Sequence, residues 1–147
     1  MVFKDDLAYW VSSGYDFIGA PWATTWVYSF PQMGSALDEI IFHINVGNGG
    51  FSLRKIAAFI DVLAEFEWYL TKCKVSEEDA FFSLAGHIST NFKVPNAIVA
   101  SQFSIECEPQ KYLKISNQLP MGTHAWEKYD KELWLEIFKQ NGIHGLS

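Results

Sequence analysis

The spacing of apolar residues changes abruptly near the middle of the chain. A largely apolar run at Ile40–Ile44 has the character of a buried strand. Helical spacing follows, with apolar residues at Ile56, Phe59, Ile60, Leu63, Phe66 and Leu70. We therefore predict a strand over residues 38–46 and a helix over residues 53–72, joined by Asn45–Arg54, which we call the glycine stretch.

The glycine stretch holds three glycines in four positions, Gly47, Gly49 and Gly50. Glycine allows a positive φ and lets a ligand approach the backbone closely. The free N–H groups at the start of a following helix suit an anion such as a phosphate. The stretch has neither the lysine of a Walker loop nor the spacing of a dinucleotide fingerprint. An ordinary strand-to-helix turn that binds nothing therefore remains the alternative.

The remaining pattern alternates strands and helices, which predicts an α/β or α+β class. A helix that starts at Ser76 is expected to have a capping box completed by Asp79. In the N-terminal part we expect a helix over 5–13 with Leu7, Trp10 and Val11 on one face, a strand over 15–22 ended by glycine and proline, and a strand or an extended loop over the aromatic residues 23–38. In the C-terminal part we expect a loop over 87–96, an apolar run over 98–106 that ends in a strand, and a turn over 118–124. The last expected helix is spaced by Trp126, Tyr129, Leu133 and Ile137 and capped by Gly142.

Composition narrows the class of protein. The 147 residues fit one domain, and 49% hydrophobic residues suffice for a sizeable core. A net charge of −6 without a basic run argues against nucleic-acid binding. No apolar run approaches the length of a membrane span. The start at Met1–Asp6 lacks a signal-peptide pattern, and Cys73 and Cys107 are isolated, so we expect reduced thiols and a cytoplasmic location.

The order of elements suggests that the sheet is incomplete. The first expected strand is short, and no earlier βαβ unit supplies parallel neighbours. We expect residues 1–147 to be one domain that forms the C-terminal part of a larger sheet domain. A self-contained small domain is the competing interpretation.

Several stretches, taken together, resemble a domain-of-unknown-function family of glycosyltransferase-like proteins related to the GT-A nucleotide-sugar transferase fold. They occur in the family's order and span nearly the whole chain: Tyr15–Trp22, Val46–Arg54, Glu78–Asp79, Ala100–Glu106 and Pro120–Trp126. The resemblance implies a mixed sheet flanked by helices, a nucleotide-sugar donor and a glycan acceptor. It also implies that the nucleotide-binding half, with its metal-holding Asp-x-Asp, is missing here, since the adjacent Asp5 and Asp6 do not match that motif.

The resemblance also assigns roles to particular residues. Asp79 matches the carboxylate that takes the acceptor proton, with Glu78 beside it, and His124 matches a late ligand of a divalent metal, Mn²⁺ or Mg²⁺. Substrate contacts are expected from Gly47, Asn48, Gly49, Gly50, Phe51, Arg54, Trp22 and Glu106. Arg54 is expected to pair with phosphate or Asp79, and Glu106 to orient Arg54 or a sugar hydroxyl.

Each assignment has a structural alternative. Glu78 and Asp79 form an acidic first turn, which the helix dipole favours without any catalysis. A tryptophan such as Trp22 or Trp126 often belongs to the core, and a lone histidine often lies on the surface. The alternative function is therefore a non-catalytic module that binds a carbohydrate or a partner.

Overall fold

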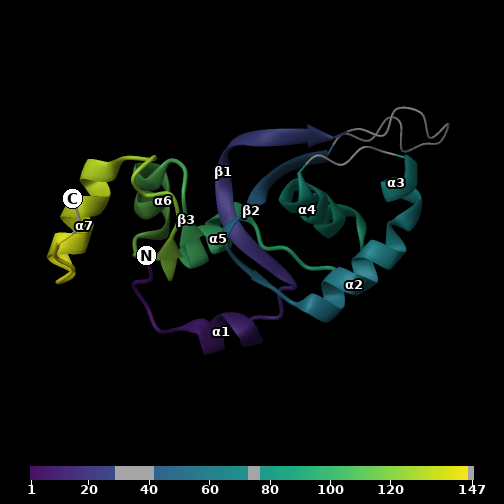
Figure 1. The fold of residues 1–147 in the computed structure, drawn as a ribbon, viewed down its shortest axis with the longest axis horizontal. Coiled ribbons are helices and arrows are strands. Elements are labelled where there is room, and N and C mark those ends of the chain that lie inside the picture. The colour runs from purple at the N-terminus through teal and green to yellow at the C-terminus, as the bar shows by residue number, and fades with distance from the viewer. Residues whose placement is uncertain (29–41, 73–76, 146–147) are drawn as a thin grey trace.

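A long antiparallel β-ribbon organises the molecule. The computed structural model describes residues 1–28, 42–72 and 77–145. Strand β1 (Phe17–Tyr28) pairs with β2 (Phe42–Arg54), with Phe17 opposite Arg54 and Tyr28 opposite Phe42. In Figure 1 the ribbon occupies the centre, α2, α3 and α4 lie on one side, and α5, α6, β3 and α7 lie on the other. The predicted α/β class is confirmed.

Helices on the first side bury the aromatic residues of the chain's middle. These helices are α2 (Ile56–Glu65), α3 (Glu67–Lys72) and α4 (Glu78–Ile88). The Phe17 side chain from β1 is fully buried and meets the Phe59 ring from α2 edge to face, with centroids 5.5 Å apart. Most aromatic rings of this region therefore belong to the core and do not line a ligand site.

The second side consists of short elements. They are α1 (Leu7–Ser12), α5 (Ala97–Phe103), β3 (Ser104–Ile105), α6 (Pro109–Ser116), β4 (Gly122–Thr123) and α7 (Lys131–Gln140). β3 and β4 are parallel, and Ile105 lies opposite Thr123. Among the described residues, no helix is long and apolar enough to cross a membrane.

The glycine stretch is not the predicted strand-to-helix turn. It continues β2 as far as Arg54, and α2 begins only at Ile56. Shifts in the β1–β2 register flank Ala20 and Pro21, so the ribbon absorbs its glycines and a proline as irregularities rather than ending there. The N-terminal end of α2 consequently lies beside Asp16, whose carbonyl accepts the Lys55 N–H at 2.9 Å, and it offers no N–H groups to the glycines.

Other boundaries also differ from the predictions. The helix predicted over 53–72 is divided at Phe66, whose backbone leaves the helical region. The strand predicted over 15–22 runs on to Tyr28, so the first residues of the segment 23–38 are a strand, one of the two forms expected for it. The apolar run predicted over 98–106 is first a helix, α5. α6 was not predicted; it is eight residues long, and its buried residues are Pro109 and Tyr112. Two predictions lie outside the described residues. They are the start of the strand predicted over 38–46, which falls in residues 29–41, and the capping box, which involves Ser76.

The ends of the chain follow the predictions more closely. The helix predicted over 5–13 forms as α1, although Trp10 alone is buried while Leu7 and Val11 are exposed. The last helix, α7, starts at Lys131, later than the spacing from Trp126 implies. It ends as predicted at Gly142, where the Ile143 N–H bonds the Phe138 carbonyl in a Schellman arrangement.

Gly47 is a position where the ribbon requires glycine for two reasons, its backbone conformation and its packing. Its φ is +117°, and a Cβ there would overlap the Ser83 hydroxyl and lie 2.8 Å from the Phe17 ring. We expect Gly47→Ala to lower the free energy of unfolding by about 2–4 kcal/mol, from backbone strain together with overpacking. Chemical denaturation measures the loss.

Gly14→Ala is the matched control for that substitution. Gly14 also has a positive φ, +82°, but nothing lies within 4 Å of its added Cβ. Gly14→Ala should therefore lower the free energy of unfolding only through backbone strain, by about 1 kcal/mol. Equal losses in the two variants would contradict the packing role of Gly47.

Candidate functional site

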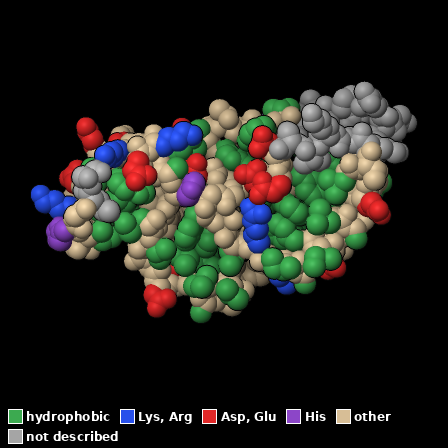
Figure 2. Space-filling view, in the orientation of Figure 1, with side chains coloured by type: hydrophobic (Ala, Val, Ile, Leu, Met, Phe, Trp, Pro, Cys, Tyr) green, Lys and Arg blue, Asp and Glu red, His purple; other side chains and the backbone are tan. Residues whose placement is uncertain are grey.

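The backbone of Gly49 and Gly50 lies between two groups of polar side chains. We call this arrangement the glycine site; it comprises Gly49, Gly50, Arg54, Glu78, Asp79, Glu106 and His124. Figure 2 shows acidic and basic side chains and a histidine across the middle of one face, with tan surface between them. The site therefore joins residues from four separate stretches of the chain.

The first group is an ion pair beside Gly49. Arg54 Nη2 donates to Glu78 Oε1 at 3.0 Å, and Arg54 Nε donates to Ser52 Oγ at 3.2 Å. The guanidinium also lies over the Phe17 ring, 5.3 Å from its centroid. The hydrogen bond from Arg54 lowers the pKa of Glu78 below its usual value, so this carboxylate stays ionised at neutral pH. An anionic ligand would have to compete with Glu78 for Arg54.

Asp79 ties α4 to the glycine site. Its Oδ2 accepts the Gly49 N–H at 3.1 Å, and its Oδ1 accepts the Ala80 N–H at 2.8 Å. Of the two partners expected for Arg54, Asp79 is not the carboxylate that it contacts, because Arg54 pairs with Glu78. Its pairing with a phosphate stays a prediction. Consecutive residues on the helix point in different directions. Even so, both carboxylates contact other residues of the glycine site: Asp79 accepts the Gly49 N–H, and Glu78 pairs with Arg54.

The second group is a histidine–glutamate pair. His124 Nδ1 and Glu106 Oε2 are 3.0 Å apart; the Glu106 side chain is 9% exposed and that of His124 is 50% exposed. Glu106 follows β3 and His124 follows β4, so the parallel pairing of Ile105 with Thr123 sets these residues side by side. With Nδ1–H donating to Glu106, the neutral ring presents Nε2 as an acceptor. Glu106 thus orients His124 rather than Arg54, one of the two partners expected for it, and its contact with a sugar hydroxyl stays a prediction.

The absence of side chains at Gly49 and Gly50 is what allows both groups to approach. A Cβ on Gly50 would overlap the His124 ring, and one on Gly49 would lie 2.7 Å from Arg54 Nη2. The backbone thus fills the space between the ion pair and the histidine. The close approach predicted for these glycines is made by the protein's own side chains.

The other predicted substrate-binding residues have structural contacts. Trp22 packs against the core and meets Trp26 edge to face at 6.1 Å. Phe51 stacks on Phe103 at 5.2 Å between ring centroids. Asn48 Oδ1 accepts the Gly50 N–H at 3.0 Å, and Gly47 is buried. Trp126 packs on Phe138 at 4.9 Å.

The metal-ligating capacity of the site is small. Among the described residues, no group of three or more His, Cys, Asp or Glu side chains is placed to hold a metal ion. His124 Nε2 is the one ring nitrogen of the glycine site that Glu106 does not engage. A divalent ion here would therefore need other ligands, such as water and the oxygens of a phosphate.

The fold and the glycine site define a mixed α/β protein in which a glycine-rich strand separates an ion pair from a histidine–glutamate pair. The chain belongs to the family described as "Protein of unknown function (DUF5672)", whose model matches residues 1–124. That range includes every residue of the glycine site and leaves α7 outside. No curated protein and no solved structure matches the chain.

Proposed function

We propose that this protein is a glycosyltransferase that moves a sugar from a nucleotide-sugar donor to a glycan acceptor. The observation that carries the proposal is the convergence of Arg54, Glu78, Asp79, Glu106 and His124 on the Gly49–Gly50 backbone. The residues that the GT-A resemblance assigns to chemistry come from distant stretches and nevertheless meet at one place. A purely structural acidic turn gives no reason for the histidine–glutamate pair to lie opposite it.

The chemistry of transfer assigns each group a task. Asp79, half-buried beside Gly49, is the base that takes the proton from the acceptor hydroxyl. Arg54 holds the donor diphosphate, an anion that its planar guanidinium suits, after giving up Glu78. Glu106 keeps His124 oriented.

A divalent cation, Mn²⁺ or Mg²⁺, belongs to the same proposal. When bound, it would neutralise the charge that develops on the leaving diphosphate. Mg²⁺ usually keeps several waters and substrate phosphates, so it needs few protein ligands. Nε2 of His124 would supply one such ligand. A cytoplasmic location is also part of the proposal, supported by the free, buried Cys107.

The alternative is a non-catalytic module that binds a carbohydrate or a partner. One observation favours it: both Asp79 oxygens accept backbone N–H groups, and Glu78 is bonded to Arg54. These carboxylates therefore also have structural roles. Asp79 keeps further lone pairs on each oxygen, so those bonds leave it able to accept a proton.

A transfer assay separates the two functions. The full natural polypeptide is incubated with nucleotide-sugars, glycan acceptors and Mn²⁺ or Mg²⁺, and mass spectrometry follows the glycosylated product. We expect product formation that chelation of the metal abolishes and that Arg54→Ala reduces at least about tenfold, since donor binding loses its cation. The exposed Lys139→Ala is the control. Saccharide binding without product from any donor would support the non-catalytic module.

A further inference from the structure

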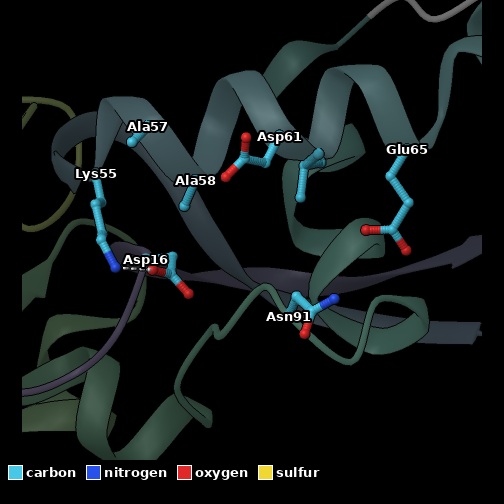
Figure 3. A pocket seen from close by; sticks show the side chains of 8 residues that line it. Asp16, Lys55, Ala57, Ala58, Asp61, Glu65 and Asn91 are labelled. Atoms are coloured by element: carbon cyan, nitrogen blue, oxygen red, sulfur yellow. Dashed lines mark ion pairs between the residues drawn. The ribbon is translucent and has the colours of Figure 1, made fainter.

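A cavity separate from the glycine site lies beside α2. It has a volume of about 570 Å³ and is lined by Asp16, Lys55, Ala57, Ala58, Asp61, Val62, Glu65 and Asn91. Figure 3 shows Asp61 and Glu65 projecting from α2 toward the side where Asp16 and Asn91 lie. None of these residues belongs to the glycine site. The volume falls within the range typical of small-molecule pockets, about 300–1,000 Å³.

Hydrogen bonds hold two carboxylates of this cavity in place. Asp16 is 6% exposed; its Oδ1 lies 3.2 Å from Lys55 Nζ, and its Oδ2 accepts the Lys93 N–H at 2.9 Å. Glu65 Oε2 accepts the Ser89 hydroxyl at 2.7 Å. Burying a carboxylate such as Asp16 is costly unless it is paired in this way. Asp16 and Glu65 are therefore held in position before any ligand arrives.

Small side chains leave room between the polar groups. Ala57 and Ala58 form part of the wall together with Val62, so part of the lining is apolar. Across from it, the Asn91 side chain offers both an amide donor and a carbonyl acceptor. A flat ligand with an apolar face and a polar rim fits such a lining.

The charges of the lining narrow the ligand class. Three carboxylates repel a phosphate or another anion, and the described residues hold no group of three ligands close enough for a metal ion. An organic cation would be attracted by the net negative charge of the lining, but it offers no hydrogen-bond acceptor to Lys55 or Asn91. A neutral polyhydroxylated ligand can instead donate to Asp61 and Glu65 and accept from Lys55 and Asn91.

We infer that this cavity is a saccharide-binding site apart from the glycine site. The carboxylates and Asn91 bond the hydroxyl groups of the sugar, and the C–H face of the ring rests on the alanines and Val62. The inference does not rest on sugar transfer, because a transferase and a non-catalytic module would each use such a site to hold a glycan.

The test is an NMR titration of the ¹⁵N-labelled full chain with glucose, galactose, mannose, N-acetylglucosamine and lactose. We expect saturable shifts of the amides around Ala57, Asp61 and Asn91 with at least one of these sugars, at a roughly millimolar dissociation constant. Ala57→Phe places a ring in the cavity and should weaken binding at least about tenfold. Asp61→Ala removes an exposed hydrogen-bond acceptor and should also weaken sugar binding.

Ala64→Phe is the matched control, because Ala64 is exposed on the same helix and does not line the cavity. It should leave sugar binding unchanged, and thermal unfolding checks that all variants fold. Three results would overturn the inference: no saturable shift with any sugar, equal affinity in Ala57→Phe and the wild type, or shifts at these amides with spermidine and not with sugars. The nucleotide-sugar transfer assay is read separately, so a loss of one activity does not imply loss of the other.

Discussion

Asp79→Asn is expected to lower the turnover of sugar transfer by about 10²–10⁴, the usual contribution of general-base assistance. The amide keeps the shape of the side chain but cannot take the acceptor proton. The measurement is steady-state transfer in the full natural polypeptide, with the rate divided by the folded fraction. The affinity for the acceptor should change little, because the substitution leaves Arg54 and the backbone of Gly49 and Gly50 in the site.

The structure adds an effect on stability to this prediction. The carboxylate accepts two backbone N–H groups, at 2.8 and 3.1 Å. The amide has one oxygen, so one of these bonds is lost, at about 1 kcal/mol. For a chain of this size, such a loss lowers the melting temperature by roughly 2–4 °C. The catalytic assignment therefore depends on turnover per folded molecule rather than on total activity.

Glu78→Gln is the matched control for Asp79. Glu78 is its exposed neighbour, and its ion pair with Arg54 contributes little to stability because water screens it. The neutral amide can still accept a hydrogen bond from Arg54, so turnover should fall much less than in Asp79→Asn. If Asp79→Asn melts earlier but each folded molecule keeps near-wild-type turnover, then Asp79 only ties α4 to β2, and the case for an enzyme loses its main residue.

Gly50→Val is the second substitution with a large expected effect. The new Cβ would occupy the position of the His124 ring, so the imidazole must move away from the Gly50 backbone. A displacement of about 1 Å in catalytic geometry costs on the order of 10²-fold in rate. We expect a loss of that size in transfer, measured together with the His124 ring signals by NMR, which should shift.

A residue on the same strand controls for the effect of valine itself. His43 is exposed on β2, so His43→Val introduces the same β-branched side chain far from the glycine site. Gly49→Val should resemble Gly50→Val in rate but act through Arg54, whose Nη2 lies 2.7 Å from the new Cβ. Equal transfer by the Gly50 and His43 variants would mean that the glycine stretch is an ordinary part of the strand.

The amino-acid sequence alone indicated several features that depend on local patterns. The helical spacing that starts at Ile56 predicted α2, and the glycine after Asn141 predicted the end of α7. Both follow from backbone and side-chain preferences that act within a few residues. The glycines at 49 and 50 were identified as a place of close approach for the same reason, since only a missing Cβ permits one.

Tertiary structure decided what makes that close approach. β2 runs through the glycine stretch because β1 supplies hydrogen-bonding partners across the register shifts, a long-range pairing that no local pattern encodes. The pairing of Glu106 with His124 likewise depends on β3 and β4, strands of two residues each, whose sequences carry no usable period. The sequence thus determined which residues have reactive side chains and at which positions the backbone must lack a side chain. Contacts between distant segments determined that Arg54 meets Glu78, that Glu106 meets His124, and that both pairs meet at Gly49 and Gly50.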